Sequence, residues 1–207
     1  MSVSASTVVL SSASTKCKNV TFTAKLNKPM PETKTKLGLV GVDVYGPDSE
    51  LFAGTAFKRI GKTTKYKGSV KLCGSHDAGK YRAEIYGVVI TKTNIVTTNK
   101  VKKNVFLKRP SRLTLDATPE PVVKGQRLTA TGSLVVDDKA LANAKVTIYF
   151  KAKGKKTFKY KGTAVTDVAG NYTKQFTASK NGTWKVEYAG NSSRNEAAAT
   201  DVVKVTK

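Results

Sequence analysis

The sequence is short of several residue types that enzymes and metal proteins require. Its 207 residues include one histidine, two cysteines, one tryptophan and 14 acidic residues. A catalytic triad or a metal site needs His, Cys or carboxylate partners that the fold can bring together. His76 lies in the turn GSHDAG and is best explained as a solvated turn residue, and Asp167 as the cap of a turn that Gly170 allows. We therefore expect no enzymatic activity, no metal site and no cofactor.

Long hydrophobic runs are also missing. No apolar segment approaches the roughly 20 residues that a membrane span requires, so no transmembrane segment is expected. The first residues, MSVSASTVV, lack the basic and apolar regions of a signal peptide. Because the use of cysteine favours an oxidising compartment, we expect a secreted or cell-envelope protein whose signal peptide has been removed.

Positive charge is the strongest signal in the composition. The chain carries 37 Lys and Arg against 14 Asp and Glu, which gives a formal net charge of +23, and both halves are basic. Only six of these cations are Arg. Lys suits diffuse attraction to anions, whereas Arg supplies the planar fork that reads phosphates and base edges. The composition predicts an anionic partner and argues against sequence-specific recognition of nucleic acid.

Short segments with two-residue alternation fill most of the chain. NVTFTAKL, AKVTIYF and DVVKVTK are rich in β-branched and aromatic residues, and no stretch has a helical period. Turn signals such as YGPDSE, DVAGN and SKNG recur about every ten residues. This pattern predicts an all-β protein built as antiparallel β-sandwiches.

An internal repeat divides the chain in two. DAGKYRAEIYG at residues 77–87 matches KNGTWKVEYAG at residues 180–190, and a period near a hundred residues suits two whole domains. Pro110 in LKRPS cannot join a sheet interior and marks the boundary. We therefore predict one domain at residues 1–109 and another at residues 110–207.

The repeat extends upstream at offsets of 104 to 108 residues. The aligned pairs are Ser6 with Ser111, Lys16 with Lys124, Tyr45 with Tyr149, Gly54 with Gly162, and Tyr66 with Tyr172. Within the matched late strands, alternation places Tyr81, Ala83 and Ile85 inward in the first copy and Trp184, Val186 and Tyr188 inward in the second. Arg82, Glu84 and Tyr86 are expected on the outer face.

Three segments of the second half resemble a known family. The turn TDVAGNYT, the late strand GTWKVEYAG and the opening LTLDATPEPVVKGQRLTATGSL are similar to tandem bacterial immunoglobulin-like (Big-type) domains of secreted and surface proteins, particularly of actinobacteria. The resemblance covers residues 110–207 well and the first half more weakly. It implies two tandem immunoglobulin-like sandwiches and specifies a fold rather than an activity. DAGKY resembles the tyrosine corner of such folds, with Ala83 where a cysteine is expected.

The two cysteines both lie in the first half. In an immunoglobulin-like sheet Cys17 opens one strand and Cys73 closes the antiparallel strand beside it, so the geometry favours a Cys17–Cys73 disulfide. A loop of that span would be stabilised by roughly 3 to 4 kcal/mol. The alternative is two separate buried thiols.

Two basic segments are candidate binding sites. KAKGKKTFKYKG contributes Lys151, Lys153, Lys155, Lys156, Lys159 and Lys161, and FKRIGKTTKYK contributes Lys58, Arg59, Lys62, Lys65 and Lys67. Alternation puts Phe158 and Tyr160 on one face of the first segment and Lys159 and Lys161 on the other. The segments are interpreted either as anion-docking faces or as charged edges that block aggregation. Tyr86, outward beside basic residues, is a further predicted contact.

The longest candidate loop is KLNKPMPETKTKLG at residues 25–38, an insertion relative to the second copy. An exposed Met30 between two prolines is predicted to protrude from it as a contact. Such a loop would suit an enzyme inhibitor or a toxin component, although surface loops of this kind are more often simply variable.

Taken together, the sequence predicts a non-enzymatic binding or spacer module that docks proteins or anionic cell-wall polymers through its Lys-rich faces. Two alternatives stay open. One is non-specific binding of nucleic acid through the same charge, and the other is inhibition or toxicity through the loop at residues 25–38.

Overall fold

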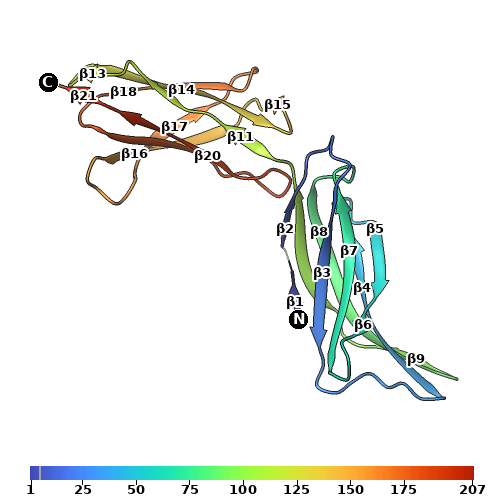
Figure 1. The fold of residues 1–207 in the computed structure, drawn as a ribbon. Coiled ribbons are helices and arrows are strands. Elements are labelled where there is room, and N and C mark those ends of the chain that lie inside the picture. Colours follow the sequence, from blue (N-terminus) through green and yellow to red (C-terminus); the bar gives the residue numbers. More distant parts are fainter. Residues whose placement is uncertain (5) are drawn as a thin grey trace. The chain divides into compact units, whose positions relative to one another are not determined.

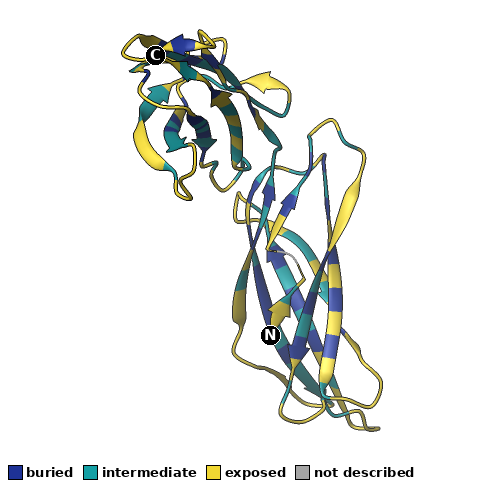
Figure 2. Cartoon of the chain, turned by 60° about the vertical axis from the view of Figure 1, so that its left-hand side comes forward, coloured by how far each residue is buried: buried dark blue, intermediate teal, exposed yellow. Residues whose placement is uncertain are grey.

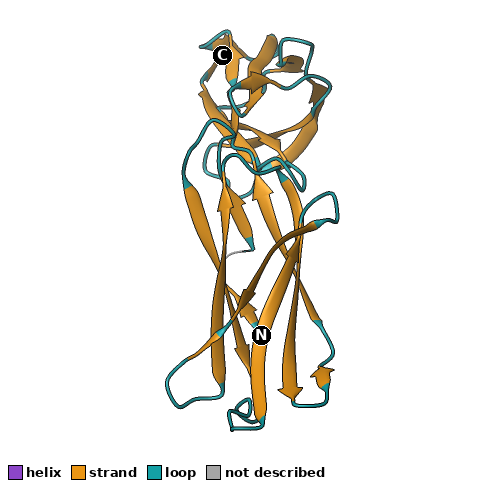
Figure 3. Cartoon of the chain, turned by 90° about the vertical axis from the view of Figure 1, so that its right-hand side faces the viewer, coloured by secondary structure: helices purple, strands orange, loops and turns teal. Residues whose placement is uncertain are grey.

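The computed structural model of the chain describes residues 1–4 and 6–207 and divides into two compact units. Unit 1 is Met1–Lys108 and unit 2 is Arg109–Lys207. The described residues form strands, turns and loops and include no helix (Figure 3). Each unit buries its own cluster of hydrophobic side chains.

Unit 1 is a sandwich of two sheets (Figure 1). One sheet has the order β1-β3-β7-β6, and the other has the order β2-β10-β8-β4-β5 with β9 added beside β8. The strands are β1 (Ser2–Val3), β2 (Thr7–Val9), β3 (Cys17–Lys25), β4 (Lys36–Tyr45), β5 (Leu51–Ala56), β6 (Lys58–Arg59), β7 (Lys65–Cys73), β8 (Gly79–Thr91), β9 (Ile95–Thr97) and β10 (Val101–Lys108). All neighbours are antiparallel except β2 and β10. This distribution of strands between two sheets is that of an immunoglobulin-like sandwich, so the predicted fold is confirmed.

Unit 2 repeats this plan. β14 lies at the centre of one sheet, flanked by β11, β12, β15 and β18, while the other sheet has the order β17-β16-β19-β20 and β13 pairs with β21. The strands are β11 (Ser111–Leu113), β12 (Asp116–Thr118), β13 (Val122–Val123), β14 (Arg127–Val136), β15 (Lys139–Ala140), β16 (Lys145–Ala152), β17 (Lys159–Val165), β18 (Asn171–Thr177), β19 (Gly182–Tyr188), β20 (Ala197–Val203) and β21 (Val205–Thr206).

The sequence repeat corresponds to equivalent strands in the two units. β3, β4, β5, β7 and β8 take the same places in unit 1 that β14, β16, β17, β18 and β19 take in unit 2. The pairing of β4 with β5 shifts register at Tyr45, and the pairing of β16 with β17 shifts at the aligned Tyr149. An irregularity at the same repeat position indicates that the local bend is encoded in both copies.

The match of Ser6 with Ser111 does not extend to strand pairing. Ser6 aligns with Ser111, yet β2 runs parallel to β10, whereas β11 runs antiparallel to β14. The strand of unit 2 that takes the place of β2 is β13, which runs parallel to β21. Each unit begins with short apolar segments that divide between the two sheets, and sequence similarity does not tell which segment joins which sheet.

Alternation along the strands builds both cores. Tyr81 and Ile85 of β8 are buried, as are Trp184, Val186 and Tyr188 of β19, so their predicted inward orientation is confirmed. Figure 2 shows buried residues alternating with exposed or intermediate residues along the strands, and mainly exposed residues in the loops. Burying a large apolar side chain contributes about 1.5 to 3 kcal/mol, so these strands account for much of the stability of each unit.

A disulfide joins Cys17 and Cys73, which face each other across β3 and β7. The predicted pairing is confirmed, and it lies within one sheet. The position of the cysteine expected in β8 is taken by Ala83, which is buried without exposure to solvent.

Two turns have the polar contacts that the sequence predicted. The hydroxyl of Tyr81 donates a hydrogen bond of 2.8 Å to the backbone oxygen of Asp77, which completes the tyrosine corner. In unit 2, Oδ1 of Asp167 accepts hydrogen bonds from the backbone N–H groups of Ala169 and Asn171 at 2.9 and 2.8 Å. Asp167 therefore caps the turn, as expected.

Candidate functional site

The densest basic segment forms one hairpin of unit 2. Lys151 belongs to β16, Lys159 and Lys161 belong to β17, and Lys153, Lys155 and Lys156 lie in the loop that joins these strands. All six except the partly buried Lys151 are exposed. The structure thus brings together the residues that the sequence proposed, and we call residues 151–161 the lysine hairpin.

Aromatic side chains lie on the outer face beside this hairpin. Tyr149 is paired with Tyr160, and their rings meet edge to face with centroids 6.3 Å apart. The Nζ of Lys151 lies 4.9 Å from the ring centroid of Phe158. Tyr160 is 63% exposed, so a flat ring is available to a ligand next to several ammonium groups.

Lys185 completes this cluster from the neighbouring strand. Its Nζ lies 4.5 Å from the ring centroid of Phe158 and 5.1 Å from that of Tyr149. It also forms an ion pair of 2.6 Å with Oε1 of Glu187. We call Tyr149, Lys151, Phe158, Tyr160 and Lys185 the aromatic–lysine cluster.

Lys161 of β17 points away from the cluster. The Nζ of Lys161 lies 5.9 Å from the ring centroid of Phe150, whose ring packs against Trp184 with centroids 4.9 Å apart. Phe158 and Tyr160 therefore lie on one side of the hairpin and Lys161 on the other, as alternation predicted.

Unit 1 contains the equivalent arrangement at aligned positions. Arg82, which aligns with Lys185, places its Cζ 4.7 Å from the ring centroid of Tyr45, which aligns with Tyr149. Nε of Arg82 lies 3.2 Å from Oε1 of Glu84, which aligns with Glu187. This Nε is buried and lacks hydrogen-bond geometry, so the interaction with Glu84 is an ion pair rather than a hydrogen bond.

Glu84 is surrounded by cations. In addition to Arg82, Nζ of Lys100 lies 3.0 Å from Oε2 and Nζ of Lys102 lies 4.0 Å from Oε1. The hydrogen bond from Lys100 lowers the pKa of Glu84 below its ordinary value, against the opposing effect of partial burial. The same hydrogen bond raises the pKa of Lys100. Glu84 lies on the predicted face, but these side chains cover it and leave it buried.

Tyr86, a predicted contact, takes part in this network. Its hydroxyl donates a hydrogen bond of 3.0 Å to Oδ1 of Asp43, and Nζ of Lys100 lies 5.6 Å from its ring centroid. Burial, together with the hydrogen bond to Asp43, raises the pKa of Tyr86. The residue is outward and partly buried, and its polar atom is already engaged within unit 1.

The second basic segment lies on the other sheet of unit 1. Lys58 is paired with Lys67 across β6 and β7, which places two like charges side by side. Arg59 donates hydrogen bonds from Nε to the backbone oxygen of Thr63 at 2.7 Å and from Nη2 to that of Lys62 at 3.2 Å. Arg59 therefore holds its own turn, while Lys58, Lys62, Lys65 and Lys67 stay exposed.

Met30 does not protrude, contrary to the expectation of an exposed contact. It is partly buried and packs against the core of unit 1, and its backbone N–H donates a hydrogen bond of 2.7 Å to the hydroxyl of Tyr66. A Cβ on Gly87 would lie 2.3 Å from the Met30 Cε, so the absence of a side chain there makes room for the methionine. The surrounding loop is anchored by this contact.

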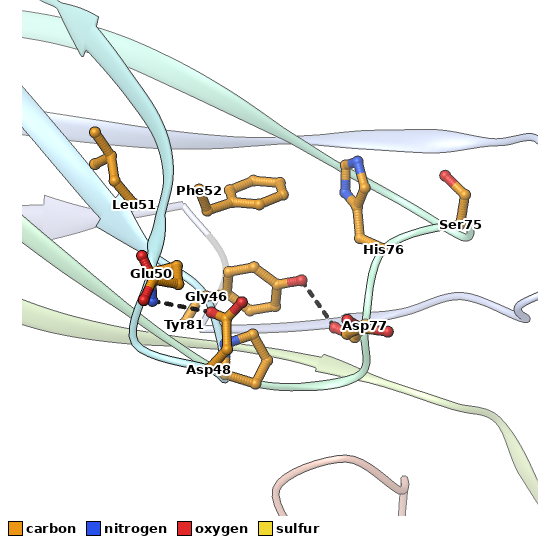
Figure 4. Close-up of a pocket in the computed structure, with 10 residues that line it drawn as sticks. Gly46, Asp48, Glu50, Leu51, Phe52, Ser75, His76, Asp77 and Tyr81 are labelled. Carbon is orange, nitrogen blue, oxygen red and sulfur yellow. Dashed lines mark hydrogen bonds between the residues drawn. The ribbon is translucent and has the colours of Figure 1, made fainter.

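His76 lines a cavity of about 370 Å³ at one end of unit 1. Figure 4 shows its ring beside Phe52, with Tyr81 directed at Asp77 and with Asp48 and Glu50 on the opposite turn. The Nδ1 of His76 accepts a hydrogen bond of 3.0 Å from the backbone N–H of Cys73, so this nitrogen supports the loop after the disulfide. His76 is partly buried, which differs from the solvated turn residue that was expected.

Residues 1–4 and 6–207 contain no group of three or more His, Cys, Asp or Glu placed to hold a metal ion. Within these ranges there is also no helix that is long and apolar enough to cross a membrane.

Tyr149, Lys185 and Glu187 are site residues that the sequence did not single out. Tyr149 and Glu187 had been aligned with Tyr45 and Glu84 only as markers of the repeat. A signal was nevertheless present, because an aromatic residue, a cation and a glutamate recur at aligned positions on the outer face of both copies.

Comparison with known proteins gave structural likenesses only. The chain matches no family model, and no curated protein matches its sequence. Among solved structures, the fibronectin(III)-like modules of Clostridium thermocellum CbhA are 15% identical over 99% of this chain and 94% of theirs, with a TM-score of 0.35. The D0-D1 domain of intimin is 18% identical over 99% of this chain and 96% of its own, with a TM-score of 0.32. The Yersinia pseudotuberculosis adhesin InvE is 14% identical over 97% of this chain and 57% of its own, with a TM-score of 0.35.

Proposed function

We propose that the protein is a non-enzymatic secreted or cell-envelope module and that the lysine hairpin of unit 2 docks an anionic cell-wall polymer. One observation carries this proposal. Residues 139–166 contain eight lysines and no Asp or Glu, and the lysine hairpin gathers six of them on two strands and one loop. Such a concentration of one sign of charge raises the local concentration of an oppositely charged polymer.

The chemistry of the cluster suits a flexible polyanion. Ammonium groups on flexible stems attract anionic groups without demanding a fixed geometry. The exposed ring of Tyr160 adds a flat surface on which an apolar part of a repeating unit can lie. Glu187 neutralises only Lys185, so the charge of the hairpin itself remains available.

The position of the hairpin also explains part of its charge. β17 is the edge strand of its sheet, and lysines on an edge strand discourage pairing with another chain. The same side chains can serve both purposes, and the experiment below separates them. The disulfide supports a location outside the reducing cytoplasm.

The test is co-sedimentation of the purified chain with Gram-positive cell walls, before and after extraction of teichoic acid, over a series of salt concentrations. We expect binding that weakens steeply with salt and disappears with the teichoic acid. DNA serves as competitor. Equal displacement of the chain by DNA and by soluble teichoic acid would mean that only non-specific polyanion binding is present.

A pair of charge-matched variants locates the site. In the first, the six lysines of the hairpin become Gln, and binding is expected to fall about tenfold or more. In the second, the same number of exposed lysines of unit 1 become Gln, namely Lys16, Lys18, Lys25, Lys28, Lys71 and Lys80. If both variants lose binding equally, net charge rather than the hairpin is responsible. If the hairpin variant binds normally but aggregates, edge protection is the role of these lysines.

A further inference from the structure

A three-stranded extension of unit 1 is not used by the proposed polymer site. It consists of the start of β4, the end of β8 and all of β9, in which Leu37 pairs with Ile90 and Ile90 pairs with Ile95. Figure 1 shows these ends of β4, β8 and β9 continuing past the body of unit 1. We call residues 36–39, 88–91 and 95–97 the apolar arm.

One face of the arm carries a row of apolar side chains, of which Leu37, Leu39 and Ile95 are exposed and Val88 and Ile90 are partly buried. Leu37, Ile90 and Ile95 lie opposite one another and therefore point to the same face, and Leu39 lies opposite Val88 on that face. Leu37 is 45% exposed and Ile95 is 66% exposed. Contiguous apolar side chains of this kind mark interaction surfaces.

The opposite face of the arm is apolar as well. Val96, which pairs with Val89, is 55% exposed, although it follows Ile95 directly in the chain. Gly38, the next residue in this row, is covered by Pro31, because a Cβ on Gly38 would lie 2.6 Å from the Pro31 Cδ. A rigid protein partner would cover one face of the tip, whereas a lipid layer can surround the tip on both faces.

The charge around the arm selects an anionic partner. Lys34, Lys36 and Lys92 flank it, and residues 32–42 and 87–103 contain six lysines against one acidic residue, Glu32, which forms a β-bridge with Leu37. A second copy of the chain would bring these lysines together and is disfavoured by repulsion. Lysines beside apolar side chains match an interface in which phosphate headgroups lie next to acyl chains.

The turn at the tip can approach such an interface at little cost. The backbone N–H of Thr91 donates to the backbone oxygen of Asn94 at 2.8 Å, and the hydroxyl of Thr91 donates to the same oxygen at 3.0 Å. The backbone N–H of Asn94 in turn donates to Oγ1 of Thr91 at 3.0 Å. Polar groups that are satisfied within the turn lose little when water is partly removed.

We propose that the apolar arm docks unit 1 onto an anionic lipid bilayer. Leu37, Ile95 and Val96 enter the boundary between headgroups and acyl chains, while Lys36 and Lys92 contact phosphate groups. The arm lies on the surface and does not span the bilayer. The proposal is independent of the polymer site, because it involves a different unit and different residues.

The test is co-sedimentation of the full chain with two kinds of vesicle, one of phosphatidylcholine alone and one of equal parts of phosphatidylcholine and phosphatidylglycerol. We expect strong binding to the mixed vesicles and weak binding to the neutral ones. The arm variant Leu37→Ser/Ile95→Ser/Val96→Ser keeps every charge and should bind the mixed vesicles about tenfold less tightly or weaker. Its control is Ile60→Ser/Val168→Ser/Val202→Ser, which removes exposed apolar side chains elsewhere and should bind normally.

The other outcomes of the vesicle experiment either support or overturn docking of the arm on lipid. Unchanged binding by the arm variant, or no binding of the parent chain to either vesicle, would overturn the proposal and leave an acidic protein as the occupant of the arm. Retained binding by the hairpin Lys→Gln variant supports it, whereas loss of vesicle binding in that variant alone would place lipid binding on the hairpin. The arm variant should still bind cell walls, so the two proposals fail separately, and unchanged thermal unfolding shows that the variants are folded.

Discussion

The two units each carry a tyrosine, a cation and a glutamate on equivalent outer faces. The glutamate is covered by neighbouring side chains in unit 1 and is open to solvent in unit 2. The side chain of Glu84 in unit 1 is 9% exposed, whereas that of its counterpart Glu187 in unit 2 is 40% exposed. The difference comes from Lys100, which lies just before β10 and donates a hydrogen bond of 3.0 Å to Glu84, and from the neighbouring strand itself. Lys102 of β10 lies opposite Glu84, while Ala198 of β20 lies opposite Glu187.

This comparison indicates how a repeated scaffold acquires different surfaces. In unit 1, Arg82, Lys100 and Lys102 are occupied with Glu84, so this sheet presents few free charges at its centre. In unit 2 a single ion pair joins Lys185 to Glu187, and the lysine hairpin beside it keeps its charge. Attraction of a polyanion is therefore expected at unit 2, although both units are basic.

The largest difference in stability between the two units is expected from removal of the disulfide. The Cys17→Ser/Cys73→Ser variant should lose about 4 kcal/mol of unfolding free energy in unit 1, because the bond closes a loop with a sequence separation of 56 residues. Hydrogen exchange of β3 and β7 measures this loss. Unit 2 has no part in the bond, and unfolding followed by fluorescence of Trp184, the only tryptophan, should stay unchanged.

A smaller effect is expected from two buried tyrosines, one in each unit, whose hydroxyl groups donate hydrogen bonds to loop backbone. The hydroxyl of Tyr172 donates to the backbone oxygen of Thr114 at 2.5 Å, and that of Tyr81 donates to Asp77. Tyr172→Phe should destabilise unit 2 and Tyr81→Phe should destabilise unit 1, each by about 1 kcal/mol near neutral pH. The exchange and fluorescence measurements just described assign each loss to its unit, and an equal loss in both units from one substitution would contradict their independence.

Tyr172 also makes unit 2 sensitive to alkali. Burial raises the pKa of Tyr172 above the ordinary value of 10.0, so the folded state retains a proton that the unfolded state releases. Its contribution to stability is complete below pH 10 and decreases as the pH rises above that value. The stability of unit 2 can be followed against pH by unfolding that is monitored through Trp184 fluorescence. Tyr172→Phe should reduce the loss of stability above pH 10, and an unchanged loss would show that another group causes the alkaline sensitivity.

The smallest of these effects is expected at the two glutamates, because one member of each pair is well exposed, Lys100 at 42% and Glu187 at 40%, and solvent screens the pairs. The pKa of Glu84 is lowered, so its contribution is present above the ordinary value of 4.5 and is lost as the pH falls below it. Glu84→Gln should therefore reduce the acid sensitivity of unit 1, measured by exchange of β8. Glu187→Gln is the matched control, and an equal effect there would mean that the closed face of unit 1 has no special role.

Much of the fold could be predicted because it depends on local and periodic features. Alternation placed Tyr81 and Trp184 in the cores, and strand order placed Cys17 beside Cys73. These features need only the period of a strand and the order of a sandwich. The lysine hairpin was predictable for the same reason, since its residues are close in sequence.

Other features depend on residues that are distant in the chain. Burial of Met30 requires the space left by Gly87, and closure over Glu84 requires Lys100 from another segment. The apolar arm was also not predicted, because residues 37, 90 and 95 belong to the outer face of the sheet and come together only when β4 pairs with the distant β8 and β8 pairs with β9.

The sequence by itself determined the two-unit organisation through the repeat, the all-β fold class and the disulfide through the period and order of the strands, and the excess of positive charge through composition. Only the tertiary structure decided which of two similar outer faces stays open, which apolar residues remain exposed and whether Met30 protrudes. These outcomes depend on side chains that the fold brings together from distant segments, such as Lys100 beside Glu84 and Met30 beside Gly87. The residue opposite on the neighbouring strand also matters, because Lys102 faces Glu84 and Ala198 faces Glu187.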